Sequence, residues 1–134
     1  TKETITLLLN VSSGRRILTS TVEALDAFPN LKLATVFAEG VPEKHAVELG
    51  AFAHEKGVTI TGPASVGVVV PLSFKFGAIG GISEKQIGTS GILNKGGVSV
   101  LSASGGMVNE LVNIVASTHN KLSFALSFGG DRKR

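Results

Sequence analysis

Apolar positions in the first half of the chain follow two different periods in turn. A short, mostly apolar run from Ile5 to Leu9 is typical of a buried strand. After the turn-forming stretch 10–14, the apolar positions recur at the spacing of one helix face. The pattern then predicts a strand over 31–38, a second helix and a strand over 58–60. The two helix faces are carried by Ile17, Leu18, Thr21, Val22 and Leu25, and by Ala46, Leu49 and Ala53.

The boundaries of these segments support the same alternation. Pro29-Asn30 interrupts the first helix, Pro42 suits the first turn of the second, and Gly57 suits its end. The order strand, helix, strand, helix, strand predicts a parallel sheet flanked by helices with right-handed crossovers. We therefore predict an α/β fold of the Rossmann-like or flavodoxin-like kind, with the end of one unit followed by the start of a second.

The pattern changes over residues 64–97, where short apolar runs stand between glycines. Alternation over 72–76 predicts a hairpin strand, and 88–97 has the composition of a loop with one helical turn. The alternation then resumes with a strand over 98–101 and a strand over 122–128. Between them we predict a helix with one apolar face made by Met107, Val108, Leu111, Val112, Ile114 and Val115.

The end of the sequence leads us to expect a piece of a longer protein. The strand over 122–128 runs into Gly129-Gly130, and such a glycine pair usually precedes another helix. The boundary between the two expected units lies in the region 62–97.

Composition excludes several classes of function. Of the 13 basic residues, three form the final tail 132–134, and the other ten balance ten acidic residues, so nucleic acid is not an expected partner. Tyrosine and tryptophan are absent, which removes the usual stacking platform for single strands. Cysteine is absent as well, so disulfides and thiolate chemistry are excluded. No apolar run is long enough for a bilayer. We expect a soluble, cytoplasmic protein without membrane contact.

The histidines do not form a catalytic or metal-binding pattern. His45 and His54 lie on the second helix without metal-ligand spacing, and surface positions are expected for both. His119 lies at the far end of the helix that follows Ser104, roughly 20 Å along its axis, too far for a catalytic pair. We predict no metal site and no catalytic residue in this chain.

The stretch Ser104-Gly105-Gly106 joins a predicted strand to a predicted helix. The first N–H groups of a helix lack internal partners, and the positive end of the helix dipole lies there. Glycines allow an anion to approach the backbone, so the pattern indicates a phosphate or carboxylate site. A serine cap followed by a tight turn explains the same residues equally well, and both interpretations stay open.

Three other strand ends carry small or polar residues, at 11–13, 38–40 and 62–65. Ligands of parallel sheets bind outside the carboxyl ends of the strands, and neighbouring strands bring such loops together. These loops therefore form a candidate site for one extended ligand. The alternative is that they are ordinary crossover turns.

Motifs along nearly the whole chain resemble one known family. The segments FAEGVPEKH, GVTITGPASVG, SFKFGAIGG, GVSVLSASGGMVNELVNIV and SFGGDR occur in the order typical of the succinyl-CoA synthetase alpha-subunit and ATP-citrate lyase family. The chain resembles the CoA-binding and ligase region of that family, with ATP-citrate lyase the more similar branch. The family joins a carboxylic acid to CoA at the expense of a nucleoside triphosphate, through a phosphohistidine.

The resemblance implies a domain organisation and a set of site residues. Residues 1–66 would be part of a CoA-binding Rossmann-like unit, 67–97 a connecting hairpin and loop region, and 98–134 the start of a flavodoxin-like ligase unit. CoA contacts would come from Val11, Ser12, Ser13, Ala38, Glu39 and Gly40; phosphate contacts from Ser104, Gly105 and Gly106; and the acyl-site vicinity would hold Ser65, Val66 and Gly67.

The resemblance also implies partners and shows departures. The expected ligands are CoA, an organic acid or its acyl phosphate, and ATP or GTP held by a separate nucleotide-grasp subunit or domain. Assembly as a homo- or hetero-oligomer is also expected. The family's first CoA loop would precede residue 1. The phosphorylated histidine has a Gly-His-Ala-Gly context that no histidine here has. Members mostly carry arginine where this chain has Ala103, which removes a positive charge beside the phosphate contacts.

Three functions therefore remain open from the sequence. The chain is part of a CoA ligase of the ATP-citrate lyase or succinyl-CoA synthetase type, or a non-catalytic relative that serves as a binding or interaction module. The third is an unrelated Rossmann-like domain that binds a nucleotide. The loosely dinucleotide-like stretch 77–81 gives the third little support, because no strongly amphipathic helix follows it.

Overall fold

The computed structural model describes residues 4–89 and 91–130, and within it the chain divides into two compact units. The first comprises the described residues up to Ser65 together with Gly130, and the second comprises Val66–Gly129. Asp131 and the basic tail 132–134 lie outside the described residues. The assignment of the units to CoA-binding and ligase roles stays a prediction.

The first unit has the alternating order that its hydrophobic pattern predicts. Its sheet has the order β1-β2-β3, and both pairings are parallel, with Leu8 opposite Ala34 and Ala34 opposite Ile60. The predicted parallel sheet is therefore confirmed for this unit. The elements are β1 (Leu7–Asn10), α1 (Ile17–Ala27), β2 (Leu33–Val36), α2 (Glu43–Glu55) and β3 (Thr59–Thr61).

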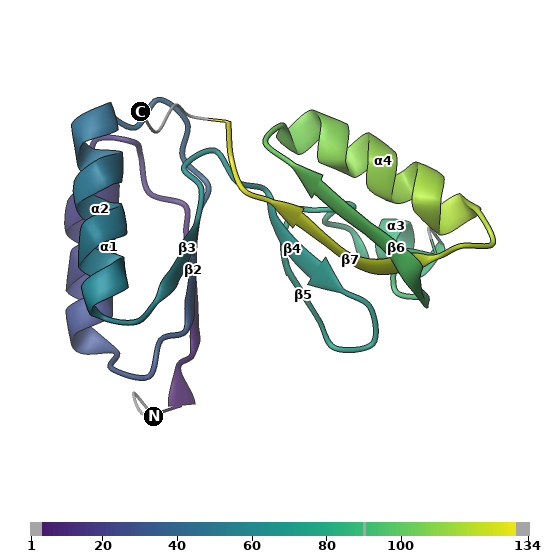
Figure 1. Cartoon of the computed structure of the whole chain (residues 1–134), viewed down its shortest axis with the longest axis horizontal. Coiled ribbons are helices and arrows are strands. Elements are labelled where there is room, and N and C mark those ends of the chain that lie inside the picture. Colours follow the sequence, from purple (N-terminus) through teal and green to yellow (C-terminus); the bar gives the residue numbers. More distant parts are fainter. Residues whose placement is uncertain (1–3, 90, 131–134) are drawn as a thin grey trace. The chain divides into compact units, whose positions relative to one another are not determined.

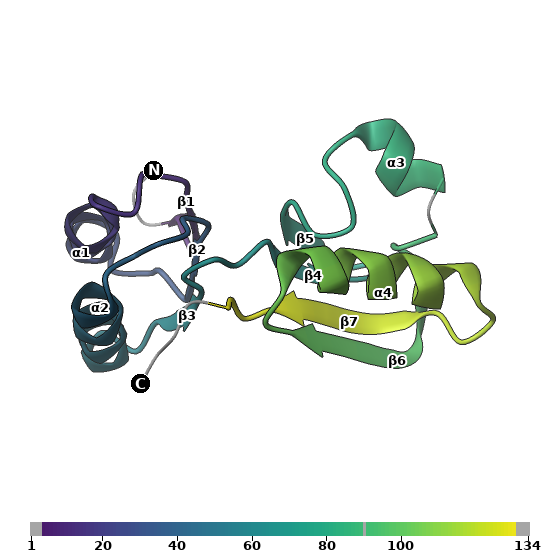
Figure 2. The ribbon, with the colours of Figure 1, turned by 90° about the horizontal axis from the view of Figure 1, so that it is seen from above.

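Both helices of the first unit lie side by side on the same face of its sheet (Figures 1 and 2). The predicted inner faces are confirmed: Ile17, Thr21 and Leu25 are buried on α1, and so are Ala46, Leu49 and Ala53 on α2. With the sheet behind them, these side chains form the core that fixes the strands and thereby the loops at their carboxyl ends.

The second unit contains a mixed sheet of order β5-β4-β7-β6. Strands β6 and β7 are parallel, whereas β4 is antiparallel to both of its neighbours. The predicted hairpin arm is confirmed as β5, and the hairpin belongs to this sheet. The elements are β4 (Gly67–Val70), β5 (Phe74–Gly77), α3 (Glu84–Thr89), β6 (Lys95–Ser102), α4 (Gly105–Ser117) and β7 (Leu122–Ser127).

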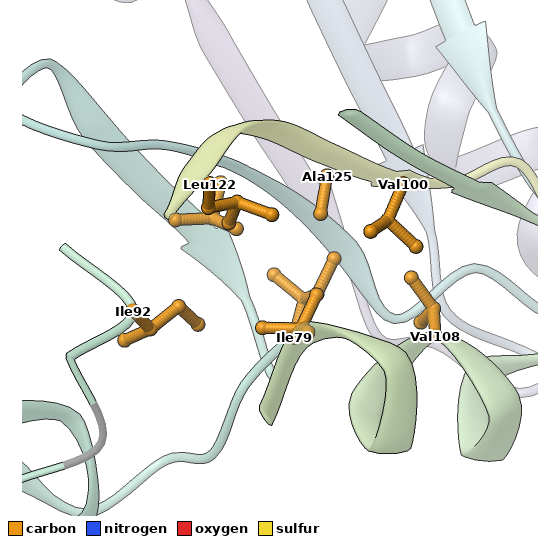
Figure 3. Packing of buried hydrophobic residues seen from close by; sticks show 8 residues of the cluster. Ile79, Ile92, Val100, Val108, Leu122 and Ala125 are labelled. Atoms are coloured by element: carbon orange, nitrogen blue, oxygen red, sulfur yellow. The ribbon is translucent and has the colours of Figure 1, made fainter. Parts of the chain in front are cut away.

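Helix α4 covers one face of this sheet (Figure 2). Figure 3 shows Leu122, Ala125 and Val100 pointing from the strands toward Ile79 and Val108. Ile79 precedes α3 in the sequence and is fully buried, so the segment after the hairpin supplies part of this core. The core fixes the direction in which α4 leaves the sheet.

Three expectations for the second unit are wrong in detail. On α4 only Val108, Val112 and Ala116 are buried; Met107, Leu111 and Ile114 are exposed and form a second apolar stripe. The helix is apolar around most of its circumference, so periodicity did not identify its inner face. Strand β6 begins at Lys95, within the expected loop, because pairing with β7 extends it. The helical turn expected within 88–97 belongs to α3, which begins earlier, at Glu84, and ends at Thr89.

Candidate functional site

The loops at the carboxyl ends of β1, β2 and β3 are joined by backbone hydrogen bonds. The N–H of Phe37 donates to the carbonyl of Asn10 at 3.0 Å, and the N–H of Ala64 donates to the carbonyl of Ala38 at 2.9 Å. The sheet thus brings the predicted loops 11–13 and 38–40 together at one edge, beside 62–65. This is the edge at which ligands of parallel sheets bind.

Gly14 allows the first two of these loops to approach each other closely. A Cβ atom at position 14 would lie 2.9 Å from the carbonyl oxygen of Glu39 and 3.3 Å from that of Gly40. Both neighbours are backbone atoms, so they could not move aside as a flexible side chain does. The loops therefore leave no space for a side chain at position 14.

Asn10 anchors the first loop, a role that sequence reasoning missed. Its side chain is buried, its Nδ2 donates to Ser20 Oγ and Thr21 Oγ1 at 2.9 Å each, and its Oδ1 accepts the Ser12 N–H at 3.0 Å. One amide thus joins the end of β1 to α1 and fixes the backbone of Ser12. A polar residue directly after a buried run, facing hydroxyls on the next helix, is the signal that could have identified it.

The six residues predicted to contact CoA differ in exposure. Val11, Ser13, Glu39 and Gly40 are exposed, whereas Ser12 and Ala38 are half-buried. Val11 is 70% exposed, so an apolar side chain stands free beside the polar loop. The loop edge is therefore accessible and offers backbone groups, two hydroxyls, one carboxylate and one exposed aliphatic side chain.

The three residues predicted for the acyl-site vicinity fall in different units. Ser65 is fully buried in the first unit, where its N–H donates to the carbonyl of Val36 at 3.1 Å. Val66 and Gly67 belong to the second unit, in which the Val66 N–H donates to Ser127 Oγ at 3.3 Å. Ser65 is thus held inside its own unit and does not present an open hydroxyl.

The start of α4 combines a serine cap with uncovered N–H groups. Ser104 is the N-cap residue, and its Oγ accepts the Met107 N–H at 3.3 Å. Ser102 Oγ in turn accepts the Ser104 N–H at 3.1 Å. Among the residues that the structure describes, no acceptor pairs with the N–H groups of Gly105 and Gly106. The capping interpretation is therefore right for Ser104, and two donors still remain for an anion.

The two glycines at this helix start have different surroundings. A Cβ atom at Gly105 would lie 2.6 Å from Val66 Cγ1, whereas a Cβ atom at Gly106 would meet nothing within 4 Å. Val66 thus packs directly against the start of α4, within the second unit. Gly105 is needed for this packing, while Gly106 faces open space on the exposed side of the turn.

Histidines and acidic residues add no further candidate. His54 and His119 are exposed and His45 is half-buried. Among the described residues, no three histidine, aspartate or glutamate side chains gather in an arrangement that could hold a metal ion. Every helix in the described part of the chain is too short or too polar to cross a membrane.

Comparison with known sequences identifies relatives over almost the whole chain, although no family model matches it. The chain is 41% identical to a probable ATP-citrate synthase subunit 1 of Neurospora crassa and 38% identical to the human ATP-citrate synthase, over 128 residues in each case. Each match covers 96% of this chain, but only 19% of the fungal protein and 11% of the human one. The chain therefore spans a fifth or less of the length of these relatives.

Comparison with solved structures gives the same relationship. An ATP citrate lyase from Methanothrix soehngenii, in complex with citrate and coenzyme A, is 32% identical with a TM-score of 0.85 over 95% of this chain and 20% of that one. A dinucleotide-forming acetyl-coenzyme A synthetase from Ca. Korarchaeum cryptofilum, in complex with phosphate and ADP, has a TM-score of 0.74 over 96% of this chain and 26% of its own. At 18% identity, this second likeness shows the fold alone.

Proposed function

Because the chain belongs to the ATP-citrate lyase family over the part of the relatives that it spans, we propose that it supplies CoA contacts and an anion-binding helix start to a CoA ligase of that type. The CoA contacts come from Val11, Ser12 and Ser13 and from Ala38, Glu39 and Gly40. The helix start is the turn Ser104–Gly106, and the anion is the phosphoryl group of a phosphohistidine or an acyl phosphate.

The observation that carries this proposal is the close approach of the loops after β1 and β2. A Cβ atom at Gly14 would lie 2.9 Å from the carbonyl oxygen of Glu39, so the two loops pack closely together at one edge of the sheet. Backbone N–H groups bind the oxygens of a pyrophosphate well, and this edge is where parallel sheets hold nucleotides. The chain is also 32% identical to a lyase that was solved with coenzyme A.

The start of α4 supports the second half of the proposal. The Gly105 and Gly106 N–H groups point along the positive end of a helix of 13 residues. Oxygen atoms of a phosphoryl group would accept from both donors, with the exposed Ser104 beside them. These groups bind and orient the anion, and the transfer itself needs a histidine that this chain does not provide.

A non-catalytic binding or interaction module is the second candidate, and Ala103 favours it. Position 103 is exposed directly before the helix start, where family members mostly carry arginine. A guanidinium there would add a bidentate partner for phosphate, so its absence weakens the anion site. The similarity to ATP-citrate synthases argues against the third candidate, an unrelated nucleotide-binding domain.

This chain alone is expected to form no acyl-CoA. It carries no histidine in the family's phosphorylated context, so the phosphoryl group has no carrier. The measurement is acyl-CoA formation from the purified chain with ATP or GTP, CoA, and citrate or succinate. A reaction containing a complete ATP-citrate lyase serves as the positive control, and turnover by the chain itself would contradict this expectation.

CoA is expected to bind weakly, at the loops after β1 and β2. Ser12→Trp should reduce the affinity at least tenfold, because the indole would occupy the space beside the half-buried Ser12 backbone. Glu39→Ala should also change the affinity for CoA measurably. The measurement is calorimetric titration with CoA, and Glu23→Ala on the exposed side of α1 is the matched control. Tight binding that neither loop variant changes would place the CoA contacts elsewhere.

A further inference from the structure

The second unit contains a cavity of about 500 Å³ beside the β4–β5 hairpin, apart from the start of α4. Cavities of this size hold small organic ligands. The hairpin supplies most of its wall, and the segment around α3 supplies the rest. Its apolar lining consists of Val70, Leu72, Phe74, Ile87 and Leu93, and its polar lining consists of Ser73 and Lys75.

Several apolar side chains at this cavity are left exposed to water by the fold. Leu72 is 80% exposed, Phe74 is 40% exposed and Leu93 is 39% exposed. Ile87, in contrast, also packs against the buried core, so the wall on that side is anchored. An apolar ligand body in the cavity would remove these surfaces from water, which is favourable in proportion to the area covered.

Among the described residues that line the cavity, Lys75 is the one cationic group. Its Nζ donates to the Gly77 carbonyl at 2.8 Å, which leaves two of its three N–H donors. None of the described carboxylates forms an ion pair with it. Burial lowers the pKa of this ammonium group, because its charge is partly removed from water without a compensating anion.

We propose that this cavity binds an aliphatic carboxylate, with the carboxylate at Lys75 and Ser73 and the chain against the apolar wall. An anion would supply the missing opposite charge, and its oxygens would accept from the remaining Lys75 donors and the Ser73 hydroxyl. A small inorganic anion would leave the apolar wall exposed. A neutral hydrocarbon would leave the ammonium group uncompensated. The two features together select one class of ligand, independently of the function proposed above.

The test is a calorimetric titration of the full chain with decanoate, below its micelle-forming concentration. Saturable binding at one site is expected, and 1-decanol should bind at least tenfold more weakly, because it lacks the charge. Lys75→Met keeps an unbranched side chain only one heavy atom shorter and removes the charge, so decanoate affinity should fall about tenfold to a hundredfold. Lys95→Met removes an exposed charge from β6 of the same unit and should leave the affinity unchanged.

A second variant keeps the proposal testable if Lys75→Met fails to fold, which circular dichroism would show. Leu93→Trp enlarges a partly exposed wall residue into the cavity and should abolish saturable binding. The proposal is overturned if the unaltered chain shows no saturable decanoate binding. It is equally overturned if 1-decanol binds as well as decanoate, or if a folded Lys75→Met or Leu93→Trp variant binds decanoate normally.

Discussion

Replacing Asn10 by alanine is expected to lower the free energy of unfolding of the first unit by about 3 kcal/mol. Three hydrogen bonds are lost, to Ser20, Thr21 and the Ser12 N–H, and each contributes about 1 kcal/mol net. Thr21 is fully buried, so water cannot readily replace its lost partner. Urea unfolding followed by circular dichroism measures this change.

The same substitution should weaken CoA binding at temperatures where the unit is still folded. The Ser12 backbone would no longer be held, and ordering a loop residue costs about 1 to 2 kcal/mol, which corresponds to a loss of about tenfold in affinity. Asn94→Ala is the matched control, because Asn94 is exposed on a loop and should change stability by less than about 0.5 kcal/mol. Normal stability of Asn10→Ala would show that the amide network does not hold this loop.

The second large effect is expected from two adjacent glycines whose substitutions act in opposite directions. Gly105→Ala should destabilise the second unit by about 1 to 3 kcal/mol, because its Cβ would lie 2.6 Å from Val66 Cγ1 and the branched side chain must move. Gly106→Ala should leave the fold intact or stabilise it by up to about 1 kcal/mol, because its Cβ enters open space and alanine favours the helix. Thermal and urea unfolding of the two variants provide the comparison.

Gly106→Ala also separates the structural role of this turn from anion binding. In the unaltered chain, phosphate should shift the amide resonances of Gly105 and Gly106 more than any others. The added methyl group should reduce this response, since it stands beside the exposed N–H group, while the fold is kept. If the largest shifts occur elsewhere and the Gly106→Ala variant binds phosphate as before, the Ser104–Gly106 turn caps the helix but does not bind the anion.

Local patterns in the sequence determined the alternating fold of the first unit. The buried positions Ile17, Thr21 and Leu25 recur at helical spacing, and Pro29 and Gly57 mark where chain segments end. These features act between near neighbours, so they can be recognised without knowing the rest of the fold. The same holds for Ser104, whose cap bond reaches only three residues along the chain.

The pairing of the second sheet, in contrast, was decided by contacts between distant residues. The extension of β6 back to Lys95 depends on β7, and the burial of Val108 rather than Met107 depends on which side of α4 meets the sheet. A helix that is apolar on two sides carries no local signal for this choice.

Tertiary structure also decided what the candidate site residues do. The sequence shows Gly105 and Gly106 as equivalent, and only the approach of Val66, from far earlier in the chain, distinguishes them. The sequence shows Asn10 as a turn residue, and only the packing of α1 against β1 gives its amide two hydroxyl partners. Chain composition determined which groups are available, whereas their hydrogen bonds and close contacts arose from the folding of segments that are separate in the sequence.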